Sequence, residues 1–193
     1  CEEIGDKKGI ATSLISIGVI YNEQGDLAIA IDYYTRGLQI FEELGYKKGI
    51  ASSLNNIGNI YNNQGDYAKA LDYYTRSLKI RKETGDKQGI ALVLNNIGAI
   101  CQQQGDLDKS IEYYTKSLKI REEVGDKRGI ASSLQNIGSI YYEQGDYYKA
   151  LEKSTKSLSI AQEIGNVKTI KNASESLWEI NKKLRKHRQA LEM

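Results

Sequence analysis

The chain has 193 residues, of which 27 are basic and 25 are acidic, so its formal net charge is only +2. This balance argues against a nucleic-acid-binding surface, which normally shows a clear basic excess on one face. No segment approaches the roughly 18 consecutive apolar residues needed to cross a membrane, and no signal-peptide pattern opens the sequence. We therefore expect a soluble protein with no nucleic-acid partner and no membrane insertion.

The two cysteines, Cys1 and Cys101, restrict the chemistry further. Cys101 occupies the place that tyrosine holds in related segments of the chain, which is typical of a buried, reduced core thiol. Two cysteines supply neither a disulfide framework nor a zinc site, so we expect no bound metal. A reducing, cytoplasmic location is the simplest interpretation.

The first residues are similar to a segment further along the chain. Residues 1–6 (Cys-Glu-Glu-Ile-Gly-Asp) align with residues 41–46 (Phe-Glu-Glu-Leu-Gly-Tyr), which are predicted to end a helix and form a turn. We therefore interpret residues 1–8 as the end of a preceding repeat, and we expect the sequence to be a fragment of a longer protein. A processed or engineered boundary is the alternative.

A repeat of 40 residues fills residues 9–165. Its four copies open at Ile10, Ile50, Ile90 and Ile130. A fixed period in this range indicates a solenoid, in which each repeat packs only on its neighbours.

The second copy shows what one repeat should form. Its apolar residues lie at i, i+4, i+7 and i+11, which is one stripe of an α-helix: Ile50, Leu54, Ile57 and Tyr61. Gly65 can stop this helix, and Asp66 can cap a second helix that runs from about Tyr67 to Glu83. The inner face of the second helix is predicted to hold Ala70, Leu71, Tyr74, Ser77 and Leu78. Short turns make the two helices antiparallel, and the small residues Gly58 and Ser77 indicate that they approach closely.

These residues resemble the signature of the tetratricopeptide repeat family. The resemblance is carried by Leu54, Ile57, Gly58, Tyr61, Ala70 and Tyr74, and their spacing recurs in the other copies. It implies an all-α fold, namely a right-handed superhelical α-solenoid of antiparallel helix pairs. Two features depart from the family: the repeat is longer than the usual 34 residues, and the chain has no proline. In the fourth copy Ser154 replaces the tyrosine of the other copies, and we expect the packing to loosen or change there.

Residues 166–193 are predicted to form a divergent fifth repeat or a C-terminal capping helix. Leu177 keeps the register of Ile137, but Trp178 replaces the repeated glycine. In the capping interpretation Trp178 covers the last open face, because the ends of a solenoid need a polar cap. The two interpretations are compatible. His187, the only histidine, is expected to be a solvated surface residue.

A second stripe on the first helices is polar and is not explained by the core. Asn is a mediocre helix former, and an ordinary exposed face would carry Glu, Lys or Gln. In the tetratricopeptide family the first helices line a concave groove, so the resemblance implies that this stripe binds an extended peptide or a partner helix. The candidate peptide-binding residues are Asn55, Asn56, Asn59, Asn63, Asn95, Asn96, Gln135, Asn136, Ser139 and Tyr142. The alternatives are that these side chains only bond neighbouring helices, or that they reflect a genome rich in codons for Asn, Ile, Lys and Tyr.

No catalytic site and no cofactor are predicted. Gly-Asp pairs such as Gly65-Asp66 are helix stops and caps rather than phosphate or metal loops, and no nucleophile, base and orienting group converge. The predicted function is therefore a protein-interaction module with a protein or peptide ligand, and the sequence indicates no oligomeric state. The alternative is a regulatory or sensory arm of a larger bacterial signalling enzyme, a histidine kinase or nucleotide cyclase, whose N-terminal regions the junctions at 85–91 and 125–131 resemble.

Overall fold

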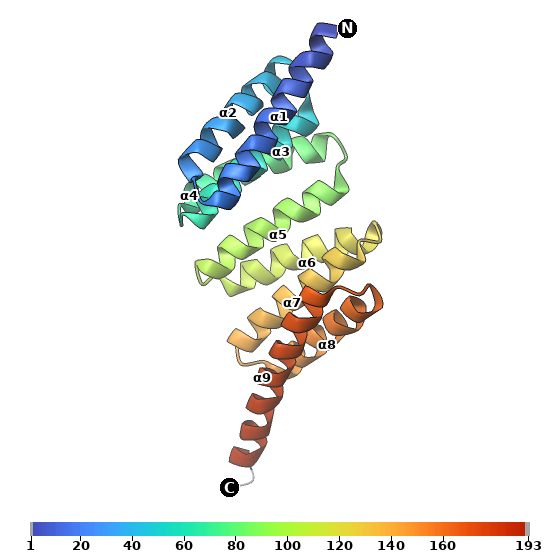
Figure 1. Cartoon of the computed structure of the whole chain (residues 1–193). Helices are drawn as coiled ribbons and strands as arrows, with labels where there is room; N and C mark the ends of the chain where they lie inside the picture. The colour runs from blue at the N-terminus through green and yellow to red at the C-terminus, as the bar shows by residue number, and fades with distance from the viewer. Residues whose placement is uncertain (1, 192–193) are drawn as a thin grey trace. The chain divides into compact units, whose positions relative to one another are not determined.

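The computed structural model describes the backbone of residues 2–191 and the side chains of residues 6–185. Within that range the chain forms nine α-helices and no strand (Figure 1). The helices are α1 (Glu2–Gln24), α2 (Leu27–Glu43), α3 (Lys47–Asn63), α4 (Tyr67–Glu83), α5 (Lys87–Gln103), α6 (Leu107–Glu123), α7 (Lys127–Glu143), α8 (Tyr147–Glu163) and α9 (Val167–Leu191). The prediction of an all-α fold built from helix pairs is confirmed.

The helices form two compact units, Cys1–Ile100 and Cys101–Met193. In the first unit α1 packs on α2, α2 packs on α3, and α3 packs on α4. In the second unit α6 packs on α7, α7 on α8, and α8 on α9, and α7 also touches α9. Each unit therefore shows the stacking of successive pairs that a solenoid requires.

The turns use the predicted stop and cap. Gly65 has a φ of 78°, a left-handed conformation that glycine adopts without strain. The amide of Asp66 then donates to the carbonyl of Tyr61 at 2.9 Å, and the Asp66 carboxylate caps α4 by accepting from the amide of Lys69 at 3.1 Å. Asp26 differs, since its side chain makes no cap hydrogen bond to α2.

Small residues allow α3 and α4 to approach closely, as predicted. A Cβ atom on Gly58 would lie 2.7 Å from Cε1 of Tyr74, so only glycine leaves room for that ring. On the other side of the interface Ser77 Oγ donates to the carbonyl of Ala51 at 2.8 Å. Leu54 and Ile57 are buried in the same core.

Two buried arginines tie the end of one pair to the start of the next, and the sequence analysis did not anticipate them. Arg121 Nη1 in α6 donates to the carbonyl of Gly129 at 2.6 Å and to Ser133 Oγ at 3.1 Å. Both partners lie in α7. At the junction between α4 and α5, Arg81 in α4 forms an ion pair with Asp86, which directly precedes α5. Burial of a guanidinium is costly unless its donors are satisfied, and these contacts satisfy several of them.

The ends of the chain differ from expectation. Helix α1 continues through Gly5 and Asp6, where a turn was predicted. Trp178 was predicted to cover the last open face, but its side chain is 62% exposed. Its position corresponds to Gly138, which faces the second helix of its own pair, and α9 has no such helix after it within residues 2–191. His187 and Cys1 lie outside the described side chains.

Cys101 is buried and free, as predicted. Desolvation by burial, with a smaller effect of the Asp106 charge, raises the pKa of its thiol. Among the described residues no helix combines the length and the apolar character that a membrane crossing needs.

Candidate binding face and pocket

Charge is distributed unequally between the two helices of the pairs α3–α4, α5–α6 and α7–α8. The first helices α3, α5 and α7 carry charged residues only near their ends, and residues 49–63, 88–103 and 129–142 contain none. By contrast, the single second helix α4 has charged residues along its whole length: Lys69, Asp72, Arg76, Lys79, Arg81, Lys82 and Glu83. The polar residues of the first helices are therefore almost all neutral amides and hydroxyls. We use the term first-helix face for the polar residues of α3, α5 and α7.

In the first unit, four side chains of this region form one hydrogen-bonded network. Asn96 Nδ2 donates to Asn55 Oδ1 and to Asn59 Oδ1, each at 3.2 Å. The hydroxyl of Tyr74 donates to the same Asn59 oxygen at 2.7 Å. The network joins α3, α4 and α5, and Asn55 within it is only 5% exposed. For Asn55 and Asn59 the contact between neighbouring helices, raised above as an alternative, is therefore present.

The second unit pairs its first helices in a similar way. Gln135 Nε2 in α7 donates to Ser176 Oγ in α9 at 2.7 Å. The two partners are 41 residues apart, as are Asn55 and Asn96. Neighbouring first helices are thus joined by a polar contact with the same sequence separation in both units. Polar residues 41 positions apart are therefore the sequence signal that would have predicted these contacts.

The remaining predicted residues reach the surface to different degrees. Asn63 and Ser139 are exposed. The others are half-buried: Asn56, Asn59, Asn95, Asn96, Gln135, Asn136 and Tyr142. The structure brings Ser139 and Tyr142 together at a pocket.

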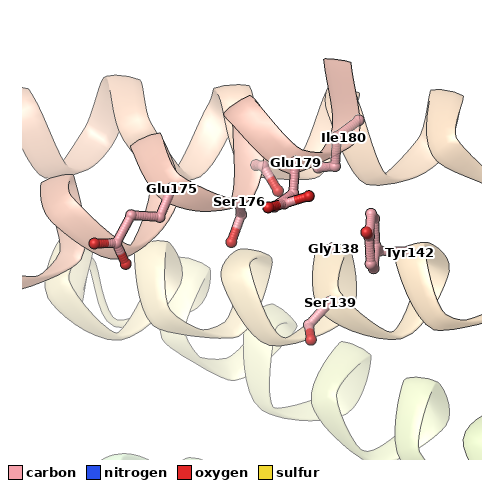
Figure 2. A pocket seen from close by; sticks show the side chains of 8 residues that line it. Gly138, Ser139, Tyr142, Glu175, Ser176, Glu179 and Ile180 are labelled. Atoms are coloured by element: carbon pink, nitrogen blue, oxygen red, sulfur yellow. The ribbon is translucent and has the colours of Figure 1, made fainter. Parts of the chain in front are cut away.

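This pocket lies between α7, α8 and α9 (Figure 2) and has a volume of about 250 Å³. Its lining residues are Gly138, Ser139, Tyr142, Ser154, Glu175, Ser176, Glu179 and Ile180. Figure 2 shows Ser176 and Glu179 on α9 across the space from Gly138 and Tyr142 on α7. The Tyr142 ring is held by an edge contact with Tyr147, with ring centroids 5.5 Å apart.

The pocket exists where the fourth repeat departs from the others. Tyr34, Tyr74 and Tyr114 are buried in the first three repeats, and burial raises the pKa of Tyr114 to about 12. The corresponding Ser154 is fully buried, and its Oγ has no hydrogen-bond partner among the described residues. The looser packing predicted for this copy is therefore a cavity, next to an unsatisfied hydroxyl.

No metal centre is found in the described part of the chain, where no group of three or more His, Cys, Asp or Glu side chains is placed to hold an ion. The face and the pocket offer amides, hydroxyls, apolar side chains and, at the pocket, two carboxylates.

Residues 9–83 and 89–163 match the tetratricopeptide repeat family. Because the matches cover most of the sequence, the chain belongs to this family. Tetratricopeptide repeats are protein-interaction modules. A comparison with curated proteins finds no significant match.

Solved structures with the same fold include three of different kinds. BtubC from P. vanneervenii is 19% identical, with a TM-score of 0.76, and the match covers 95% of this chain and 80% of that one. Aspartyl phosphate phosphatase F from Bacillus subtilis is 17% identical, with a TM-score of 0.85 and coverage of 96% and 50%. A signal transduction ATPase with numerous domains from Pyrococcus horikoshii, which has a tetratricopeptide repeat sensor, is 23% identical, with a TM-score of 0.79 and coverage of 89% and 27%. At these identities the likeness shows the fold alone.

Proposed function

We propose that the chain is a non-catalytic, cytoplasmic interaction module that binds an extended peptide or a partner helix on the first-helix face. The observation that carries the proposal is the segregation of charge in three pairs: the second helices α4, α6 and α8 are densely charged, while the first helices α3, α5 and α7 present neutral amides and hydroxyls. A surface that only needed to be soluble would carry charges on both.

An amide side chain both donates and accepts, so it can satisfy the N–H and C=O groups of a bound segment. In the first unit this role falls to Asn56, Asn63 and Asn95. In the second unit it falls to Asn136 and Ser139. Asn96 donates to both Asn55 and Asn59 on the neighbouring first helix, so we assign these three residues mainly to positioning the face.

The ligand we propose is not held by its C-terminal carboxylate. Carboxylates are bound most strongly by Arg and Lys, which form charge-assisted hydrogen bonds. Residues 129–142 contain neither. Recognition would therefore run along the backbone of the ligand and through side-chain pockets.

The test is selection from a random peptide library displayed on phage, followed by affinity measurements with synthetic versions of the selected peptides. The binding variant is Asn56→Ala with Asn136→Ala, which removes one amide from each unit. The control variant is Gln39→Ala with Gln162→Ala, which removes two exposed amides from the second helices α2 and α8. Circular dichroism confirms that all three proteins are folded.

We expect the wild type and the control to bind the same selected peptides, and the Asn variant to bind them about thirtyfold more weakly, because it loses two hydrogen bonds worth about 1 kcal/mol each. If no peptide is enriched, or if the Asn variant binds as well as the control, the first-helix face is not the binding site.

A sensory arm of a larger signalling protein is the second candidate. It is favoured by the likeness to the Pyrococcus protein, whose repeats are described as a sensor and of which this chain matches 27%. Sequencing the gene on both sides of the 193 residues tests it. A catalytic domain in the same reading frame would support the sensory arm, and stop codons close to both ends would exclude it.

A further inference from the structure

The first repeats show what normally occupies the place where the fourth repeat has its pocket. Tyr34 and Tyr74 lie against glycines of the preceding first helix, and a Cβ atom on Gly18 or Gly58 would come within 2.7 Å of the tyrosine ring. Both rings are at most 2% exposed. Each of these repeats therefore has a ring seat, which we define as the space between the first-helix glycine and the second-helix tyrosine position.

The hydroxyl of the seated tyrosine is bonded at the rim. Tyr74 donates to Asn59 at 2.7 Å, and Tyr114 donates to Gln102 Oε1 at 3.4 Å. With the 40-residue period, the fourth-repeat counterpart of Asn59 is Ser139 and that of Gln102 is Tyr142. Both line the pocket, and both have hydroxyls that can accept a hydrogen bond from a phenol.

The fourth repeat has the seat without the ring. Gly138 is retained, and the nearest atom to a Cβ built on it is Ser154 Oγ at 2.9 Å. Ser154 is 0% exposed, and its hydroxyl is unpartnered among the described residues. Ile180 of α9 completes the lining and is 1% exposed. An apolar cavity with a few polar groups directed at it is typical of a ligand site.

The opening of the seat is acidic. Glu175 and Glu179 of α9 line it, and the described lining residues include no Lys or Arg. Glu175 has a cation nearby in Lys171, but the N–O distance is 3.9 Å and both side chains are more than 60% exposed, so that ion pair is weak. Glu179 is half-buried. A cation entering beside these carboxylates would also lie near Tyr142, whose ring face attracts positive charge.

We propose that the ring seat of the fourth repeat binds a tyrosine side chain that a partner peptide presents next to a basic residue. The ring occupies the place that Tyr74 fills in the second repeat, its hydroxyl donates to Ser139 or Tyr142, and the neighbouring cation pairs with Glu179. The proposal rests on the proposed function, because it names the side chains that a peptide on the first-helix face would present to the second unit.

The first test uses tyramine, which combines a phenol with an ammonium group, as the probe. Amide chemical shifts of the 15N-labelled full chain are followed during titration with tyramine and, for comparison, with 4-hydroxyphenylacetate, which has the same ring and a negative charge. We expect tyramine to shift the amides of residues 138–142 and 175–180 saturably, and the acid to bind at least tenfold more weakly.

Ser154→Tyr is the decisive variant, because it restores the residue that the other repeats carry at this place. It is expected to fold with an unchanged or higher melting temperature and to lose saturable tyramine binding. Glu179→Gln, which leaves the cavity empty, should weaken tyramine binding about tenfold and leave the binding of uncharged p-cresol unchanged. Tyramine that binds elsewhere, binds folded Ser154→Tyr as well as the wild type, or does not bind at all overturns the proposal.

The second test distinguishes a peptide from a free amine with the blocked tripeptide acetyl-Lys-Tyr-Lys-amide. Shifts at the same amides that disappear in Ser154→Tyr support a peptide side chain, whereas binding of tyramine without the tripeptide overturns the peptide assignment. The Asn56→Ala, Asn136→Ala variant should retain tyramine binding, since neither asparagine lines the pocket. Failure of the ring seat and failure of the first-helix face are therefore observed separately.

Discussion

Two equivalent glycines should respond in opposite ways to the same substitution. Gly58 and Gly138 hold corresponding places in α3 and α7, but Gly58 faces Tyr74 and Gly138 faces Ser154. We therefore compare Gly58→Ala with Gly138→Ala. In both cases alanine favours the helix by about 1 kcal/mol relative to glycine, so any difference in stability comes from the contacts of the new methyl group.

At position 58 the methyl group meets a ring that cannot move. It would lie 2.7 Å from Cε1 and 2.8 Å from Cδ1 of Tyr74, and that ring is buried and bonded to Asn59. Overpacking of this kind costs about 1–3 kcal/mol, so after the gain in helix propensity we expect Gly58→Ala to lower the free energy of unfolding by about 1 kcal/mol.

At position 138 the methyl group meets a side chain that can move. The nearest atom is Ser154 Oγ at 2.9 Å, and the next two lie at 3.5 Å. The serine hydroxyl has no hydrogen bond to lose and can rotate to another staggered position. Gly138→Ala should therefore raise the free energy of unfolding by about 0.5–1 kcal/mol.

The assay is native-state hydrogen exchange of the α3 and α7 amides, supported by urea unfolding. Repeat arrays need not unfold in a single step, so a local measurement assigns each effect to its helix. The control is Gly58→Ala combined with Tyr74→Ser: removing the ring should remove the clash, so that the glycine substitution becomes neutral or favourable in that background. If Gly58→Ala alone is as stable as the wild type, the ring seat is not as rigid as the contacts indicate, and the reasoning is refuted.

Three further predictions concern other features of the chain. Arg121→Ala should lower the free energy of unfolding, measured by urea unfolding, by about 1–3 kcal/mol, because Ser133 Oγ loses its buried donor and the Gly129 carbonyl loses the guanidinium hydrogen bond. A loss well below about 1 kcal/mol would mean that water replaces the guanidinium. Burial raises the pKa of the Cys101 thiol, so in a Cys1→Ser background iodoacetamide should react with the folded protein far more slowly than with the unfolded one at neutral pH, and equal rates would contradict the burial. Hydrogen bonds from the Lys69 side chain and backbone lower the pKa of Asp66, and the same contacts of Lys109 and Lys149 lower the pKa values of Asp106 and Asp146. These shifts stabilise the folded state, fully above the unfolded carboxyl pKa of about 4, and the stabilisation is lost as the pH falls through the folded pKa values. Replacing the three caps by Asn, which caps without titrating, should therefore make the acid unfolding curve less steep below about pH 4, and an unchanged curve would show that other carboxylates control it.

The periodic part of the fold could be predicted from the sequence because each copy repeats the same physical constraints. The stripe through Leu54 and Ile57 sets the buried side of α3, and Gly65-Asp66 sets the turn. The predicted range of α4, Tyr67 to Glu83, coincides with the helix in the structure. These features depend on local conformation and on periodicity, both of which are present in the sequence.

The features that depend on neighbouring helices were less predictable. Asn55 and Asn56 are adjacent in the sequence, yet Asn55 is buried against Asn96 and Asn56 is half-buried; the stripe alone does not say which of two neighbouring amides turns into the interface. Trp178 was expected to be covered, but the helix on which it would pack is not within residues 2–191. The substitution at Ser154 indicated looser packing, but the cavity also depends on where α9 places Ile180 and Glu179, which only the structure shows.

The ring seat has a consequence for how a chain of this type can be altered. The glycine of the ring seat is present at Gly18, Gly58 and Gly138. In the first and second repeats a single tyrosine, Tyr34 or Tyr74, fills the seat. Because each repeat packs only on its neighbours, replacing Tyr34 or Tyr74 by serine would vacate an equivalent seat elsewhere and leave the fourth repeat untouched. In each such repeat a single residue would then decide whether the ring seat is filled by tyrosine or available to a ligand. A binding site could be transferred from one repeat to another by two substitutions, without redesigning the backbone.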